Sequence, residues 1–147
     1  MHIAIASLGR LHEAELFATS PDKMFEVRQE TTVAAAHQLR LSPGEGERLH
    51  GHNWRIVAVV RCVELDARGM VVDFNDLGSE LRRLVEPYEH VFLNEVRPYD
   101  DINPTAENIA KVVAEGLAAK IDDARVRVQR VEVWETDTCG AIYYRDA

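Results

Sequence analysis

The stretch His50-Gly51-His52-Asn53-Trp54-Arg55-Ile56-Val57-Ala58-Val59-Val60 joins a histidine pair to a long apolar run. Because successive side chains of a β-strand point to opposite faces, a strand here projects His50 and His52 to the same side. Neutral imidazoles are good zinc ligands, and a catalytic zinc usually has three protein ligands and one open position. The stretch therefore predicts a strand that carries two ligands of a metal site. The alternative is a histidine pair that only fills the surface of a strand.

The third ligand is predicted to be His37, at the end of an earlier strand-like segment. Alternation begins at Phe25 and continues through Thr31, Thr32 and Val33. Valine and threonine favour a pleated surface, so these residues predict a strand. If this strand pairs beside the first one, His37 joins the histidine pair.

Composition and charge limit the possible functions. The chain has 147 residues, enough for one domain with a real core, and 46% apolar and 29% charged residues are ordinary for a globular protein. A net charge of −8 argues against nucleic acid or an anionic membrane as partner, but a local basic pocket remains compatible with an anionic small molecule. Cys62 and Cys139 form no disulfide framework, and no apolar run reaches the ~18–20 residues of a membrane span. We therefore expect a cytoplasmic protein.

The rest of the chain predicts an α+β domain. Residues 42–48 have the composition of a loop, a long strand runs from 51 to 65, and 66–69 form the turn of a hairpin that continues at 70–72. Asp73 is expected to cap a helix that stops at Pro87, and Pro104 to take the first position of a second helix after a loop over 88–101. Strict alternation over 126–134 predicts a further strand, and 142–144 a last one.

These elements predict an antiparallel four-stranded sheet with two helices on one face. Residues 24–147 are expected to form this single domain, and residues 1–23 an N-terminal extension with a short strand at 2–6 and a helical turn or two over 11–18. Long strands with open edges are a liability for a monomer, so we expect a homo-oligomer.

Six motifs occur in an order that resembles one family, the 6-pyruvoyl-tetrahydropterin synthase and 6-carboxytetrahydropterin synthase group. The resemblance runs from about Met24 to Tyr144. The motifs are Ala35-Ala36-His37, Leu49-His50-Gly51-His52, Gly69-Met70-Val71-Val72-Asp73-Phe74, Glu89-His90-Val91-Phe92-Leu93-Asn94, Asn103-Pro104-Thr105-Ala106-Glu107-Asn108 and Trp134-Glu135-Thr136.

The resemblance implies a tunnelling fold (T-fold) whose subunits form an oligomeric barrel, a trimer or a hexamer, with active sites at subunit interfaces. It implies 7,8-dihydroneopterin triphosphate or a related pterin as substrate, and Zn²⁺ as cofactor, held by His37, His50 and His52. Glu135 matches the carboxylate that anchors the pterin in this family. Its chemistry fits independently, because a carboxylate can accept two parallel hydrogen bonds from the edge of a pterin ring. Thr105 and Glu107 match a second pterin-contacting stretch.

Both assignments have structural alternatives. Glu135 would otherwise be a solvated strand end. Thr105 and Glu107 would otherwise be an ordinary helix N-terminus, where threonine and glutamate are favoured.

The chain departs from the family where a cysteine removes a proton, because that position is Gly46, which has no side chain. Glu45 and Glu47 flank it, and a branch of the family uses a glutamate there in a retro-aldol reaction. Glu89 and His90 replace the family's Asp-His pair, and His90 remains a candidate general acid or base. Cys139 is a further candidate thiol, whereas Cys62 is most simply core.

Two functions follow from this pattern. The first is a zinc-dependent pterin lyase with weak or absent standard synthase activity. The second is a homologue that binds zinc and a pterin-like ligand without synthase activity, or acts on a different substrate. A zinc hydrolase without pterin is a third option, against which Glu135 and the 105–107 stretch count.

Overall fold

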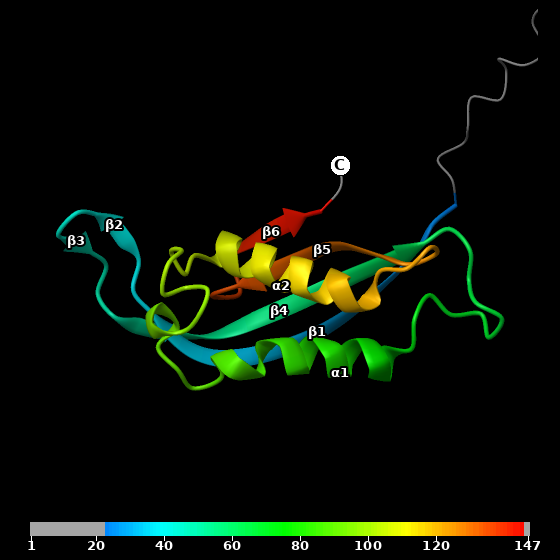
Figure 1. Cartoon of the computed structure of the whole chain (residues 1–147), viewed down its shortest axis with the longest axis horizontal. Coiled ribbons are helices and arrows are strands. Elements are labelled where there is room, and N and C mark those ends of the chain that lie inside the picture. The colour runs from blue at the N-terminus through cyan, green and yellow to red at the C-terminus, as the bar shows by residue number, and fades with distance from the viewer. Residues whose placement is uncertain (1–22, 146–147) are drawn as a thin grey trace, which may run out of the picture.

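The computed structural model describes residues 23–145, so the elements expected within residues 1–22 lie outside the described part of the chain. It contains an antiparallel four-stranded sheet in the order β1-β4-β5-β6 (Figure 1). The strands are β1 (Phe25–His37), β4 (His50–Cys62), β5 (Arg127–Trp134) and β6 (Gly140–Tyr144). The helices are α1 (Phe74–Val85) and α2 (Ala106–Ile121). The predicted fold class is confirmed.

Both helices lie against the same face of the sheet, where α1 contacts β1 and α2 contacts β5 and β6 (Figure 1). Alternate strand residues and the apolar stripes of the helices are buried between the two layers, and burial of this apolar surface stabilises the domain. The core includes Val33, Ile56, Val60, Val131, Val133, Leu77, Leu81, Val113 and Leu117.

No helix within residues 23–145 covers the other face of the sheet, yet Val57 and Val59 of β4 are buried there. Val57 pairs with Glu30 on one side and Glu132 on the other, and Val59 lies between two arginines, Arg28 and Arg130. The aliphatic stems of long charged side chains cover apolar surface while their charged ends reach water. This open face is therefore a polar layer laid over two valines.

The register of β1 and β4 decides which histidines meet. His37 pairs with His50, and Ala35 pairs with His52. Because side chains directly opposite each other in an antiparallel pair share a face, His37, His50 and His52 lie on the helix-covered side of the sheet.

Residues 42–48, which we expected to form a loop, include part of a small hairpin beyond the end of the main sheet. It consists of β2 (Arg40–Ser42) and β3 (Glu45–Gly46), and Gly44 makes the turn with a positive φ of 83°. Glycine adopts this conformation without steric cost, which explains the turn.

The hairpin predicted over 66–72 is wrong, because residues 70–72 form no strand. The turn itself exists: the Asp66 carboxylate accepts hydrogen bonds from the backbone N–H groups of Arg68 and Met70, each at 2.9 Å. The Arg125 guanidinium donates hydrogen bonds to the backbone carbonyls of Met70 at 3.3 Å and Val71 at 2.8 Å. In a hairpin these carbonyls would accept from a neighbouring strand. Strand β4 also ends at Cys62, earlier than expected.

Helix α1 begins after Asp73 as predicted, since the Asp73 carboxylate accepts from the Asn75 N–H at 2.8 Å. The second helix starts later than expected, because Thr105 is its N-cap and Pro104 lies outside it. The expected loop over 88–101 contains one short 3₁₀ helix, η2 (Leu93–Glu95), and begins within another, η1 (Glu86–Tyr88).

Candidate metal centre and adjoining pockets

Three imidazoles converge at one end of the sheet. The Nε2 atoms of His37 and His50 are 3.0 Å apart, and one nitrogen from each of His37, His50 and His52 lies within 4.8 Å of the other two. Nitrogens bound tetrahedrally to one zinc at about 2.0–2.1 Å are separated by roughly 3.3 Å. The distance between His37 and His50 is close to this spacing, and His52 is near enough to complete a three-nitrogen site.

Backbone carbonyls decide which nitrogen of each ring is free. The Nδ1 of His37 lies 2.8 Å from the Pro104 carbonyl, and the Nδ1 of His50 lies 2.8 Å from the Arg48 carbonyl. A carbonyl only accepts, so each Nδ1 carries a proton, and in a neutral ring the Nε2 keeps a lone pair. Two lone pairs then face each other across 3.0 Å, an arrangement that a bound cation stabilises.

His52 supplies the second sign of a cation site. Its Nε2 is buried and has no hydrogen-bond partner among the described residues. A proton shared between His37 and His50 would leave His52 unsatisfied, whereas a metal ion would satisfy all three rings. Burial is the main cause of a lowered His52 pKa, and the neighbouring His37 and His50 add to it while Glu135 opposes it. Neutral imidazole, the form that binds metals, is thereby favoured.

Two side-chain amides hold the loops behind these rings, and sequence reasoning had assigned a role to neither. Asn94 bonds both backbone groups of Gln38, accepting from its N–H at 2.9 Å and donating to its carbonyl at 2.7 Å. Gln38 in turn donates to the Glu47 carbonyl at 2.7 Å, next to the residue that orients His50. The only available signal was their position in the sequence. Asn94 ends the motif that begins at Glu89, and Gln38 directly follows His37. Such outer contacts orient metal ligands.

The structure places Glu135, Thr105 and Glu107 around a single pocket, with Cys139 on its wall. The Glu135 carboxylate lies 3.9 Å from the His37 Nε2, so this pocket adjoins the imidazoles. The Thr105 hydroxyl also accepts the Asn108 N–H at 3.2 Å, which is the helix-cap role named as its alternative. Its hydroxyl proton remains available as a donor.

Glu89 and His90 form a pair at 3.1 Å, but His90 makes no described contact with the three imidazoles of its own chain. The His90 side chain is 80% exposed, and its backbone has a positive φ of 56°. It lines a pocket with Ala34, Ala36 and Asn53, which alternate with Ala35, His37 and His52 along their strands. These three neighbours therefore face the other side of the sheet, although Ala35 and His52 also border the pocket.

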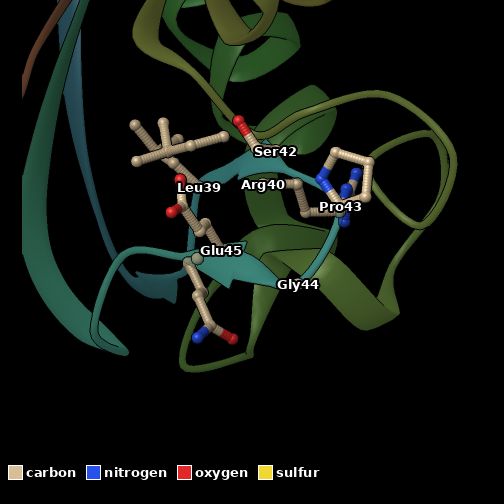
Figure 2. Close-up of a pocket in the computed structure, with 9 residues that line it drawn as sticks. Leu39, Arg40, Ser42, Pro43, Gly44 and Glu45 are labelled. Atoms are coloured by element: carbon tan, nitrogen blue, oxygen red, sulfur yellow. The ribbon is translucent and has the colours of Figure 1, made fainter.

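The two glutamates beside Gly46 have different surroundings. Glu45 lines a pocket of the β2–β3 hairpin with Leu39, Arg40 and Pro43 (Figure 2). Glu47 is close enough to His52 for its charge to act on the His52 pKa. That charge raises the pKa, while the larger effect of burial lowers it. Gly46 has no positive φ, and a Cβ there would lie 3.4 Å from the Gln38 Nε2, an ordinary contact.

An antiparallel sheet under two helices, with three imidazoles and a carboxylate pocket at one end, defines a T-fold protein with a candidate metal centre. The model of the 6-pyruvoyl tetrahydropterin synthase family matches residues 26–146. The chain therefore belongs to this family.

Individual relatives support this membership. The chain is 35% identical over 127 residues to a 6-carboxy-5,6,7,8-tetrahydropterin synthase of Synechocystis sp., covering 82% of this chain and 94% of that protein. The 6-pyruvoyl tetrahydropterin synthase structure of Caenorhabditis elegans superimposes with a TM-score of 0.72 at 24% identity, over 84% of this chain and 97% of that one. A Plasmodium vivax synthase whose catalytic glutamate is replaced by alanine gives 0.70 at 21% identity, over 86% and 100%. These two structures show the common fold.

Within residues 23–145, no helix is both long and apolar enough to cross a membrane. Both cysteines are free, Cys62 buried and Cys139 exposed.

Proposed function

We propose that this protein is a zinc-dependent lyase that acts on the side chain of 7,8-dihydroneopterin triphosphate or a related pterin. The observation that carries the proposal is the set of three imidazoles, two with Nε2 atoms facing each other at 3.0 Å and one with a buried, unpartnered Nε2. Membership of a family that acts on pterins supplies the substrate class.

His37, His50 and His52 would hold the metal. A bound zinc would supply Lewis-acid chemistry, lowering the pKa of side-chain hydroxyls. Glu135 would anchor the ring, because a carboxylate accepts two parallel hydrogen bonds from adjacent N–H groups. The Thr105 hydroxyl and the Glu107 carboxylate line the same pocket and would contact the ring at its other edge.

Proton removal is the weak point of the site, since Gly46 offers no group for it. Glu47 is the leading replacement because its charge already acts on His52, and Glu45 is the second. A glutamate is the catalytic residue in the Plasmodium vivax protein, which supports this kind of base. Losing a positioned base typically costs about 10² to 10⁴ in rate, so standard synthase activity is expected to be weak or absent.

His90, assisted by Glu89, is proposed as the general acid or base of a neighbouring copy. The His90 side chain is 80% exposed and makes no described contact with the imidazoles of its own chain, so a second subunit would bring the two together. The edge strands β1 and β6 could pair between copies. We therefore propose a homo-oligomer, a trimer or hexamer, with sites at subunit interfaces.

The alternative function is a homologue that binds zinc and a pterin-like ligand but has no synthase activity or uses a different substrate. The missing side chain at Gly46 favours it. For either function we propose a cytoplasmic location, in keeping with two free cysteines.

Product analysis by mass spectrometry tests these functions. Zinc-loaded protein would be incubated with dihydroneopterin triphosphate, with His37→Ala as the control. A 6-hydroxymethylpterin would indicate a retro-aldol lyase with a loop glutamate as base. A carboxy or pyruvoyl product would indicate synthase chemistry without the thiol, with His90 as the prime candidate. Intact substrate would overturn the lyase and favour the alternative.

A further inference from the structure

A second pocket adjoins the metal centre and opens toward the polar face of the sheet. It lies where β5 stops pairing with β4, at the residue pair Arg55 and Trp134, so β4 continues without a partner on that side through residues 50–54. His52 and Glu135 line this pocket together with Arg55, Trp134 and Asp137. A ligand anchored at Glu135 would therefore lie in a pocket that His52 and Arg55 also line.

Arg55 is held in place by an aromatic ring. Its guanidinium carbon lies 5.1 Å from the centre of the Trp134 ring, a stacked cation–π arrangement. The ring is fixed in turn, because its Nε1 donates to the Glu132 carboxylate at 3.2 Å and the ring packs closely on Gly140. A Cβ at Gly140 would come within 2.6 Å of the ring, so this position needs glycine.

The charge of Arg55 is incompletely neutralised. Its carboxylate neighbour is Glu30, at 4.0 Å, and the same Glu30 oxygen already accepts a hydrogen bond from Arg28 at 2.9 Å. The Arg55 side chain is 36% exposed, so its donors are accessible. Among the described residues that line the three pockets bordering His52 or Glu135, Arg55 is the only arginine or lysine.

We propose that Arg55 determines specificity by binding the phosphorylated end of a ligand whose ring is held at Glu135. This inference rests on the proposed function and adds the residue that would distinguish a phosphorylated pterin from an unphosphorylated one. The pocket is lined by the carboxylates of Glu135 and Asp137 and by the guanidinium of Arg55, a combination that suits a ligand carrying both N–H donors and an anionic group. A planar guanidinium binds phosphate through paired charge-assisted hydrogen bonds. On a chain of net charge −8, such a local cation decides whether an anionic ligand is accepted.

The test is a binding comparison on the zinc-loaded full chain with three probes: neopterin, neopterin triphosphate and inorganic tripolyphosphate. We expect wild type to bind neopterin triphosphate about tenfold more tightly than neopterin, the scale of one charge-assisted contact. Arg55→Gln should lose that preference and the binding of tripolyphosphate, while its neopterin affinity and zinc content stay unchanged. Arg55→Lys keeps the positive charge but loses the paired N–H donors of the planar guanidinium, so it should retain part of the preference.

Arg28→Gln is the matched control, because Arg28 contacts the same Glu30 but does not line the pocket. It should keep the wild-type preference. The inference is overturned if Arg55→Gln keeps the preference, if it weakens both pterins equally, or if Arg28→Gln has the same effect. Wild type that binds both pterins equally also overturns it and leaves the proposed function intact. Wild type that binds tripolyphosphate through Arg55 but neither pterin would support the anion site and refute the proposed function.

Discussion

At the scale of single residues, two backbone carbonyls determine what the imidazoles can do. The Pro104 carbonyl accepts a hydrogen bond from the Nδ1–H of His37, and the Arg48 carbonyl accepts one from the Nδ1–H of His50. Both rings therefore direct their Nε2 lone pairs toward the same point. His52 adds a buried Nε2 without a partner. Two lone pairs that face each other beside a buried, unpartnered nitrogen favour a bound cation.

The first prediction concerns metal content. His37→Ala and His52→Ala should each lower bound zinc from about one equivalent per chain to near zero, since a site with two protein ligands holds zinc weakly. Metal analysis after gel filtration measures this directly. His90→Ala is the control and should retain zinc; equal zinc content in all variants would contradict the metal centre.

A second residue-scale prediction concerns Gly46. Because its φ is not positive and a Cβ would lie 3.4 Å from the nearest atom, the Gln38 Nε2, a cysteine fits there without backbone strain. Gly46→Cys should therefore fold normally and raise carboxy- or pyruvoyl-pterin formation by about tenfold or more, since a positioned base contributes about 10² to 10⁴. Gly46→Ser, equal in size but without a thiol, should show no such gain. A rate equal to wild type in Gly46→Cys would mean that more than the thiol is missing.

At the scale of elements, the pairing of β1 with β4 brings the three imidazoles of the candidate metal centre together. The loop before α2 adds the Pro104 carbonyl that orients His37. The His37–His50 pair is a register position, and a slip of one residue would turn His37 to the other face. The connection from β4 to α1 is stabilised by side chains instead of strand pairing, with Asp66 bonding the backbone N–H groups of Arg68 and Met70.

This turn predicts a specific pH dependence. The backbone N–H of Met70 is the main cause of a lowered Asp66 pKa, with Arg68 and Arg125 contributing. Because the pKa is lower in the folded state than in the unfolded state, this carboxylate stabilises the protein above the unfolded value of about 3.9 and loses that effect as the pH falls through the lower folded value. Urea midpoints of wild type and Asp66→Asn should differ at pH 6, and the difference should shrink as the pH falls below the unfolded value of about 3.9. A difference that does not depend on pH would assign the effect to hydrogen-bond geometry alone.

At the scale of the whole molecule, the sheet has one face covered by helices and one face covered by its own charged side chains. That charged layer buries Val57 and Val59. It includes Arg55, which lines a pocket together with His52. Along most of its length the outer edge of β1 has no described strand partner, and the outer edge of β6 has none. His90 makes no described contact with the imidazoles of its own chain, so we propose that a second copy receives that group.

Assembly is therefore the prediction at this scale. Light scattering after gel filtration should give the molar mass of a trimer or hexamer of the 16.6-kDa chain. Activity should fall on dilution below the concentration at which the oligomer dissociates, because each site would need groups from two chains. Mixing His37→Ala with His90→Ala subunits should restore part of the activity lost in each, and a monomeric, active protein would refute the shared site.

The sequence by itself determined the elements whose signals are local. Period-two alternation marked β1 and β5, a long apolar run marked β4, and the Asp73 cap marked the start of α1. The His-x-His spacing placed His50 and His52 on one face. These features depend on neighbours a few residues away, and the structure contains each of these elements with small shifts at their ends.

Only the tertiary structure decided what depends on distant partners. The failed strand at 70–72 depends on Arg125, more than fifty residues along the chain, which takes its carbonyls. The Nε2 lone pair of His37 depends on the Pro104 carbonyl, and the position of Arg55 depends on Trp134. Periodicity carries no information about which remote group will meet a given hydrogen-bonding atom, so these contacts appear only when the chain has folded.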